Sequence, residues 1–183
     1  YLDIDCRLND LFPGIYIAPF NRFREEVLSP EKDLYRFKPN LVIFFVQLES
    51  LLDDSFRIQF STMETRQKQE EIDRIAQDIE QLLTTLTQRT NATIVFSNFV
   101  IPTFSPLGIL DSKQEIGLER FYQLINMKLE DRFRKDNQIF IFDFDQVASK
   151  FGKEKYINYP MYYRGALLLS EQFLPCVSYE LMG

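Results

Sequence analysis

The stretch that decides the fold is residues 39–49, PNLVIFFVQLE. Residues 41–46 are all apolar, and most are β-branched or aromatic, the types that favour a strand. A strand with one wet face alternates apolar and polar residues, and this stretch does not, so we expect both of its faces to be covered. Pro39 cannot donate to a strand ladder and marks the start. The first polar side chains, Gln47 and Glu49, follow at the carboxyl end, where open α/β sheets bind ligands.

The rest of the chain alternates between short apolar runs and amphipathic segments. We predict further strands at residues 15–20, 92–96 and 139–142. Helices are predicted at residues 1–12, 21–28, 63–89, 117–134, 146–151 and 166–181, the last bent at Pro175, and the two longest carry apolar residues at the three-to-four spacing of one helical face. The apolar residues of the loop 99–110, among them Phe99 and Phe104, predict that it packs down onto the protein.

This alternation predicts an α/β fold with three layers (α/β/α) and a mostly parallel sheet joined by right-handed crossovers. The length of 183 residues suits a single domain over residues 1–183. Such domains usually open on a strand, whereas this chain opens on a predicted helix. We therefore expect that the first strand either is missing from this chain or is supplied by residues 1–5, and that the domain was excised from a larger protein.

Composition excludes several function classes. The net charge of -6 argues against a protein that grips nucleic acid. There is no histidine, so no Ser–His or Cys–His pair can form within this chain, nor can a histidine-ligated zinc site. Cys6 and Cys176 lie in no Cys-x-x-Cys pair, which argues against a thiolate metal site and favours a reducing, cytoplasmic location. No signal peptide is recognisable, and no apolar run approaches the ~20 residues of a membrane span.

Polar residues at the ends of predicted strands are the candidate site. Gln47, Glu49, Asn98 and Asp143 all take such positions and could line one cleft. In the alternative interpretation, which we favour, Asn98 and Asp143 cap the next helix or order a turn.

Four segments resemble the amino-terminal part of FkbH-like proteins, and they occur in the same order. They are IYIAPFNRFREEVLSPEKDLYRFKPNLVIFF, SNFVIPTFSPLGILD, FYQLINMKLEDRF and IFIFDFDQVASKFGKEKYINYPMYYRGALLLS. The last combines an Asp-x-Asp after a strand, a Phe-Gly turn and a Tyr-Tyr pair.

The resemblance implies an SGNH-hydrolase-like (flavodoxin-like) domain that precedes a haloacid-dehalogenase-like phosphatase domain. It further implies a parent protein that transfers a glyceryl unit to an acyl carrier protein in polyketide-type biosynthesis. Mg would belong to the absent phosphatase domain, and no cofactor to this one. Asp143 and Asp145 are not expected to be the phosphatase motif, because the following Thr is missing.

SGNH hydrolases need a Ser nucleophile near the first strand and an Asp-x-x-His near the end. Here the first Ser is Ser29, beyond that strand, and residues 158–162 contain neither Asp nor His. The resemblance therefore implies a domain that has the fold of an SGNH hydrolase without its catalytic residues.

Two functions remain open. The first is a non-catalytic interaction domain that docks an acyl carrier protein or the adjacent phosphatase domain. An acidic carrier would need a basic patch, which either Arg132, Arg134 and Lys135 or Lys150, Lys153 and Lys155 could provide, with Tyr159, Tyr162 and Tyr163 as further partner contacts. The second is an esterase or acyltransferase whose nucleophile lies outside this chain. No nucleic-acid or membrane partner is expected.

Overall fold

The computed structural model describes residues 1–19, 21–158 and 169–182, and the chain divides into two compact units. Unit 1 comprises Tyr1–Ile15 and Asp143–Gly183, and unit 2 comprises Tyr16–Phe142. Among the described residues, no helix has both the length and the apolar character needed to cross a bilayer.

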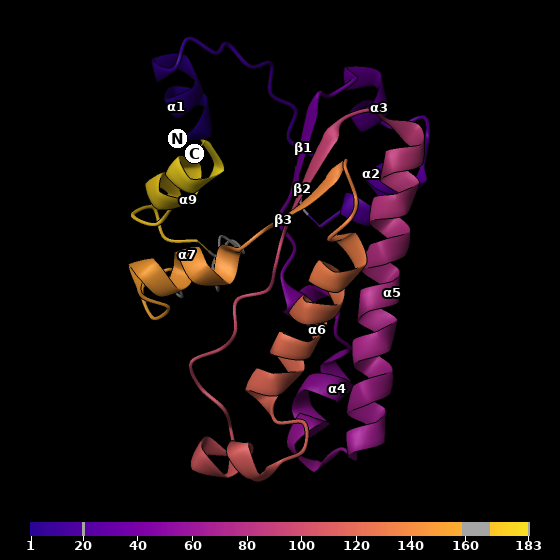
Figure 1. Ribbon diagram of the computed structural model, residues 1–183, viewed down its shortest axis with the longest axis vertical. Coiled ribbons are helices and arrows are strands. Elements are labelled where there is room, and N and C mark those ends of the chain that lie inside the picture. The colour runs from indigo at the N-terminus through magenta and orange to yellow at the C-terminus, as the bar shows by residue number, and fades with distance from the viewer. Residues whose placement is uncertain (20, 159–168, 183) are drawn as a thin grey trace. The chain divides into compact units, whose positions relative to one another are not determined.

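Unit 2 is built on a parallel sheet (Figure 1). Its described strands are β1 (Leu41–Phe44), β2 (Thr93–Ser97) and β3 (Ile139–Phe142), in the order β1-β2-β3. Phe44 lies opposite Phe96, and Phe96 opposite Ile141. The predicted parallel α/β class is confirmed, with a sheet of three strands among the residues that the structure describes.

The predicted strand at residues 15–20 is wrong. Residues 15–19 form no strand, and Phe20 lies outside the described residues. Pro19 has no N–H to offer a ladder, and the Tyr16 hydroxyl donates to Glu26 Oε2 at 2.9 Å. The composition of this segment favoured pairing with another strand, but in the folded chain it is held by a side-chain contact instead.

The faces of β1 differ from the prediction. Val42 and Phe44 are buried, whereas Leu41 is 50% exposed and Phe45, just beyond the strand, is 42% exposed. An unbroken apolar run cannot show which of its faces receives a covering helix.

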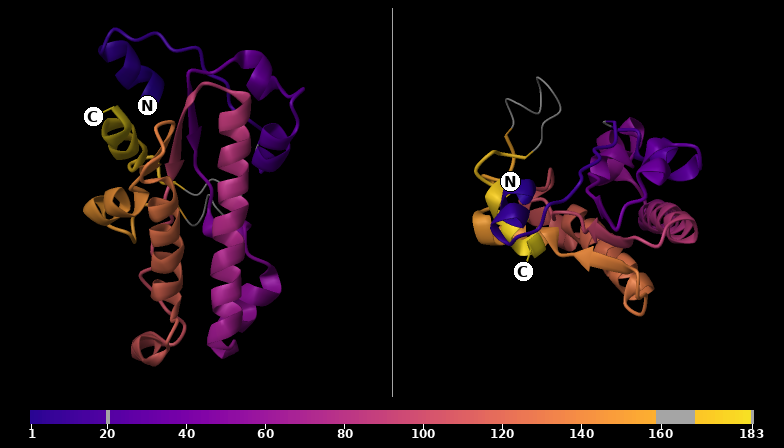
Figure 2. Two further views of the ribbon diagram at one scale, coloured as in Figure 1. Left: turned by 45° about the vertical axis from the view of Figure 1, so that its right-hand side comes forward. Right: turned by 90° about the horizontal axis from the view of Figure 1, so that it is seen from above.

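The helices of unit 2 account for most of its residues. They are α2 (Phe23–Leu28), α3 (Asp33–Phe37), α4 (Asp54–Gln59), α5 (Thr65–Arg89) and α6 (Leu118–Phe133), with short 3-10 helices η1 (Leu48–Ser50), η2 (Phe60–Thr62) and η3 (Gly108–Lys113). The start of α5 is set by a capping box, in which Glu64 and Gln67 satisfy each other's backbone N–H groups. The long helices α5 and α6 pack side by side (Figures 1 and 2).

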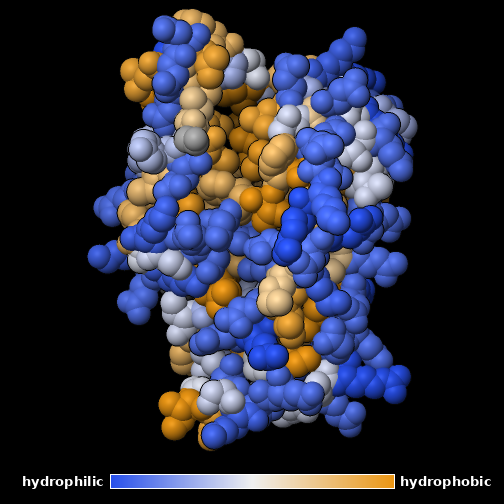
Figure 3. Space-filling view, viewed as in Figure 1, coloured by the Kyte–Doolittle hydropathy of each residue, from blue (hydrophilic) through white to orange (hydrophobic). Residues whose placement is uncertain are grey.

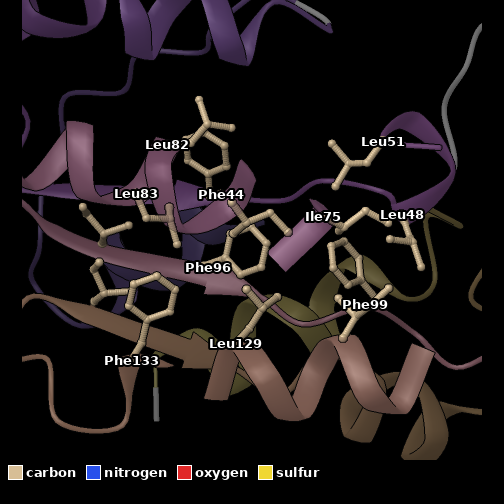
Figure 4. Packing of buried hydrophobic residues seen from close by; sticks show 14 of the residues in the cluster. Phe44, Leu48, Leu51, Ile75, Leu82, Leu83, Phe96, Phe99, Leu129 and Phe133 are labelled. Carbon is tan, nitrogen blue, oxygen red and sulfur yellow. The ribbon is translucent and has the colours of Figure 1, made fainter. Parts of the chain in front are cut away.

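The core of unit 2 lies between the sheet and these helices (Figure 4). Ile75, Leu83 and Leu86 of α5 are at most 1% exposed, and Leu129 of α6 is equally buried. Each such side chain stabilises the fold by about 1.5–3 kcal/mol relative to an exposed one. This shared core fixes α6 against the sheet and so positions the polar residues described below.

Unit 1 is made from both ends of the chain. Its described helices are α1 (Leu2–Leu8), α7 (Phe144–Phe151) and α9 (Leu174–Met182). The Ser178 hydroxyl of α9 donates to Asp5 of α1, and the Cys6 thiol contacts the Met182 sulfur at 3.7 Å. The Phe173 ring is fully buried against Phe144 and Phe151.

Two predicted helices of unit 1 are too long. The first ends at Leu8, and Asp10 takes a left-handed φ of 59°. The last begins at Leu174, after an antiparallel bridge between Ile157 and Leu169, so the part over residues 169–173 is wrong. Pro175 lies in the first turn of α9, where its missing N–H has no helical partner to lose.

Candidate functional site

Three of the four candidate residues, Gln47, Glu49 and Asn98, belong to unit 2. Asn98 directly follows β2, whereas β1 ends at Phe44, so Gln47 and Glu49 lie beyond the strand, Glu49 in η1. Gln47 is half-buried, and its carbonyl oxygen accepts hydrogen bonds from the backbone N–H and the hydroxyl of Ser50, at 3.1 and 2.7 Å. This carbonyl therefore orders the turn into η1.

Glu49 is tied to α6. Its Oε1 accepts a hydrogen bond of 2.8 Å from the hydroxyl of Tyr122, a residue that is only 6% exposed. The carboxylate itself is on an exposed residue. This bond joins η1 to the buried side of α6.

Asn98 continues the sheet beyond β2. It is 5% exposed, and its backbone N–H donates to the carbonyl of Phe142 at 3.0 Å. The next residue, Phe99, is held by the side-chain amide of Asn126, whose Oδ1 accepts from the Phe99 N–H at 2.9 Å and whose Nδ2 donates to the Phe99 carbonyl at 2.8 Å. The Asn126 amide thus satisfies both backbone hydrogen-bonding groups of Phe99, as the backbone of a neighbouring strand would.

Tyr122 and Asn126 are the residues that sequence reasoning missed. They lie four positions apart on α6, so they share one face of the helix and reach Glu49 and Phe99. In the sequence they could have been noticed as polar residues on the otherwise apolar face of a helix. Every buried side-chain nitrogen and oxygen of the described residues has a hydrogen-bond partner. The contacts of Tyr122 and Asn126 therefore join α6 to the segments that follow β1 and β2, and the hydroxyl of the Tyr122–Glu49 pair belongs to a tyrosine that is only 6% exposed.

Asp143 belongs to unit 1. Its Oδ1 accepts a hydrogen bond of 3.0 Å from the Gln146 N–H, which makes it the N-cap of α7. This is the capping role favoured from the sequence.

The lysines of the second basic cluster differ in availability. Lys153 forms an ion pair of 2.6 Å with Asp145, and its side chain is only 18% exposed. Lys150 pairs with Glu180 at 2.9 Å. Lys155 is exposed. Tyr159, Tyr162 and Tyr163 lie outside the described residues.

The first basic cluster sits at the end of α6. Arg132 pairs with Glu80 of α5 at 2.6 Å, and Arg134 pairs with Asp131 at the same distance, while Lys135 is exposed. A groove of about 870 Å³ runs between α5 and α6, and the Arg132–Glu80 and Lys128–Asp73 ion pairs lie along it. These pairs fasten the two helices together across a polar surface.

Lys68 of α5 is the most unusual charged residue. It is 2% exposed, its Nζ donates to the Ile116 carbonyl at 3.0 Å, and it lies 4.4 Å from the centre of the Phe60 ring. Burial lowers the pKa of Lys68, and the Asp111 carboxylate partly opposes this. Because its amine is occupied by the Ile116 carbonyl, we interpret Lys68 as a link between α5 and the segment that precedes α6.

Comparison with known proteins identifies the family. The family model described as FkbH, N-terminal domain, matches residues 9–183. The chain belongs to the FkbH N-terminal domain family. No curated protein matches this FkbH N-terminal domain.

One solved structure matches the fold of the FkbH N-terminal domain. It is the crystal structure of the N-terminal part of protein BF1531 from Bacteroides fragilis, which contains a phosphatase domain and is complexed with Mg. The TM-score is 0.79 at 16% sequence identity, and the match covers 99% of this chain and 46% of that chain. At this identity the likeness shows the fold alone, and the chain spans less than half of its solved neighbour.

Within residues 1–19, 21–158 and 169–182, no group of three or more Cys, Asp or Glu side chains could hold a metal ion. The described residues therefore do not fit Mg.

Proposed function

We propose that this chain is a non-catalytic interaction domain of an FkbH-like protein that loads a glyceryl unit onto an acyl carrier protein. The observation that carries the proposal is the match to the FkbH N-terminal domain over residues 9–183 in a chain without histidine. In this proposal the domain is SGNH-like in fold and does not catalyse hydrolysis. It places Mg and the phosphatase chemistry outside this domain, in keeping with the phosphatase domain of the BF1531 structure.

The contacts at the carboxyl edge support a scaffold in place of a hydrolase. Asn126 is occupied by both backbone groups of Phe99, and Glu49 accepts a bond from Tyr122. Acyl transfer needs a nucleophile with a base in hydrogen-bond reach. By distance the Tyr122 hydroxyl and Glu49 are such a pair, but Tyr122 is only 6% exposed, and the Asn126 amide is occupied by the backbone of Phe99.

A chromogenic ester assay tests the absence of catalysis. With p-nitrophenyl acetate as the substrate, we expect this chain to hydrolyse no faster than the buffer, and the Asn98→Ala variant to match it. Turnover by this chain that saturates with substrate and falls in Asn98→Ala would refute the proposal. Turnover only by a longer chain that includes the preceding residues would favour the alternative, an esterase or acyltransferase domain with its nucleophile outside this chain.

Binding of a carrier protein tests the partner. The probe is purified acyl carrier protein carrying its phosphopantetheine arm, titrated by calorimetry. Lys155→Glu and Lys135→Glu are matched variants, because each reverses one exposed lysine and each belongs to a different basic cluster. Lys153 is unsuitable, because its reversal would break the ion pair with Asp145.

We expect one of these two variants to weaken binding about tenfold, since charged groups at an interface govern encounter and register, and the other to bind normally. The absence of measurable binding by the unchanged chain, or equal binding by both variants, would contradict carrier docking through these clusters.

A further inference from the structure

We draw no further inference here: the strongest candidate, the exposed apolar patch over η3 at the lower end of Figure 3, formed by Phe104, Ile109 and Leu110, shows that the prediction of a packed-down loop is wrong for Phe104, but nothing in the structure shows what covers it.

Discussion

Replacing Asn126 by Ala should be the most damaging single change at the carboxyl edge of the sheet. The Asn126 amide makes two hydrogen bonds to the backbone of Phe99, at 2.9 and 2.8 Å, and the two residues are only 6% and 2% exposed. Truncation leaves a buried N–H and a buried carbonyl without partners, and each orphaned group costs about 1–3 kcal/mol. We take about 3 kcal/mol as the expected loss in the free energy of unfolding.

Urea denaturation, followed by the circular dichroism of the helices, measures this loss. With a slope of about 2 kcal/mol per molar urea, the midpoint should fall by about 1.5 M. Gln123→Ala is the matched control, because Gln123 lies three residues earlier on α6 and is exposed; its midpoint should stay within about 0.3 M. A loss below about 0.5 kcal/mol for Asn126→Ala would refute the reasoning, since it would mean that water replaces the amide at no cost.

Asn126→Asp separates hydrogen bonding from packing. The new carboxylate can still accept from the Phe99 N–H, but its second oxygen faces the Phe99 carbonyl, where Nδ2 now donates. Protonation restores a donor at this position, and burial raises the pKa of the introduced carboxyl group. The deficit relative to the unchanged chain should therefore shrink as the pH falls from 7 towards about 4. A deficit that is independent of pH would indicate a packing defect instead.

Two further predictions concern Lys68 and Asp143. Burial holds the pKa of Lys68 below its ordinary value of 10.5, so the folded chain binds this proton less readily than the unfolded chain. The free energy of unfolding should therefore rise, relative to Lys68→Met, as the pH rises from the lowered pKa towards 10.5; urea titrations at pH 8 and pH 10 measure the difference, and a constant difference would contradict it. Asp143→Ala removes the N-cap of α7 and should reduce hydrogen-exchange protection of its first turn by about 1 kcal/mol, whereas Asp143→Asn should preserve it; equal protection in both variants would argue against the cap.

The apolar patterns in the sequence were sufficient for the three described strands and the two long helices. The runs at residues 41–46, 92–96 and 139–142 became β1, β2 and β3, and the periodic segments became α5 and α6. These assignments succeed because a continuous apolar run or a 3.6-residue period is a local property that requires burial in almost any fold. Parallel pairing followed from the long helical connections between the strands.

The candidate site was only partly predictable. The position of Asn98 directly after β2 follows from the sequence. The prediction that Gln47 and Glu49 end a strand is wrong, because β1 stops at Phe44 and Glu49 lies in η1. The partners of these residues do not follow from the sequence, because Tyr122 of α6 lies 73 residues from Glu49 along the chain. Nothing local distinguishes a tyrosine that contacts the core from one that holds a carboxylate.

The sequence alone determined the parallel α/β class, the long helices and the lack of any histidine. Tertiary structure alone decided that residues 15–19 form no strand, that Phe104 stays exposed, and that Lys68 is buried against the Ile116 carbonyl 48 residues away. The physical reason is that local patterns set the propensity of a segment. Its hydrogen-bond partners and its burial are supplied by segments distant in the chain, and those become neighbours only when the core has packed.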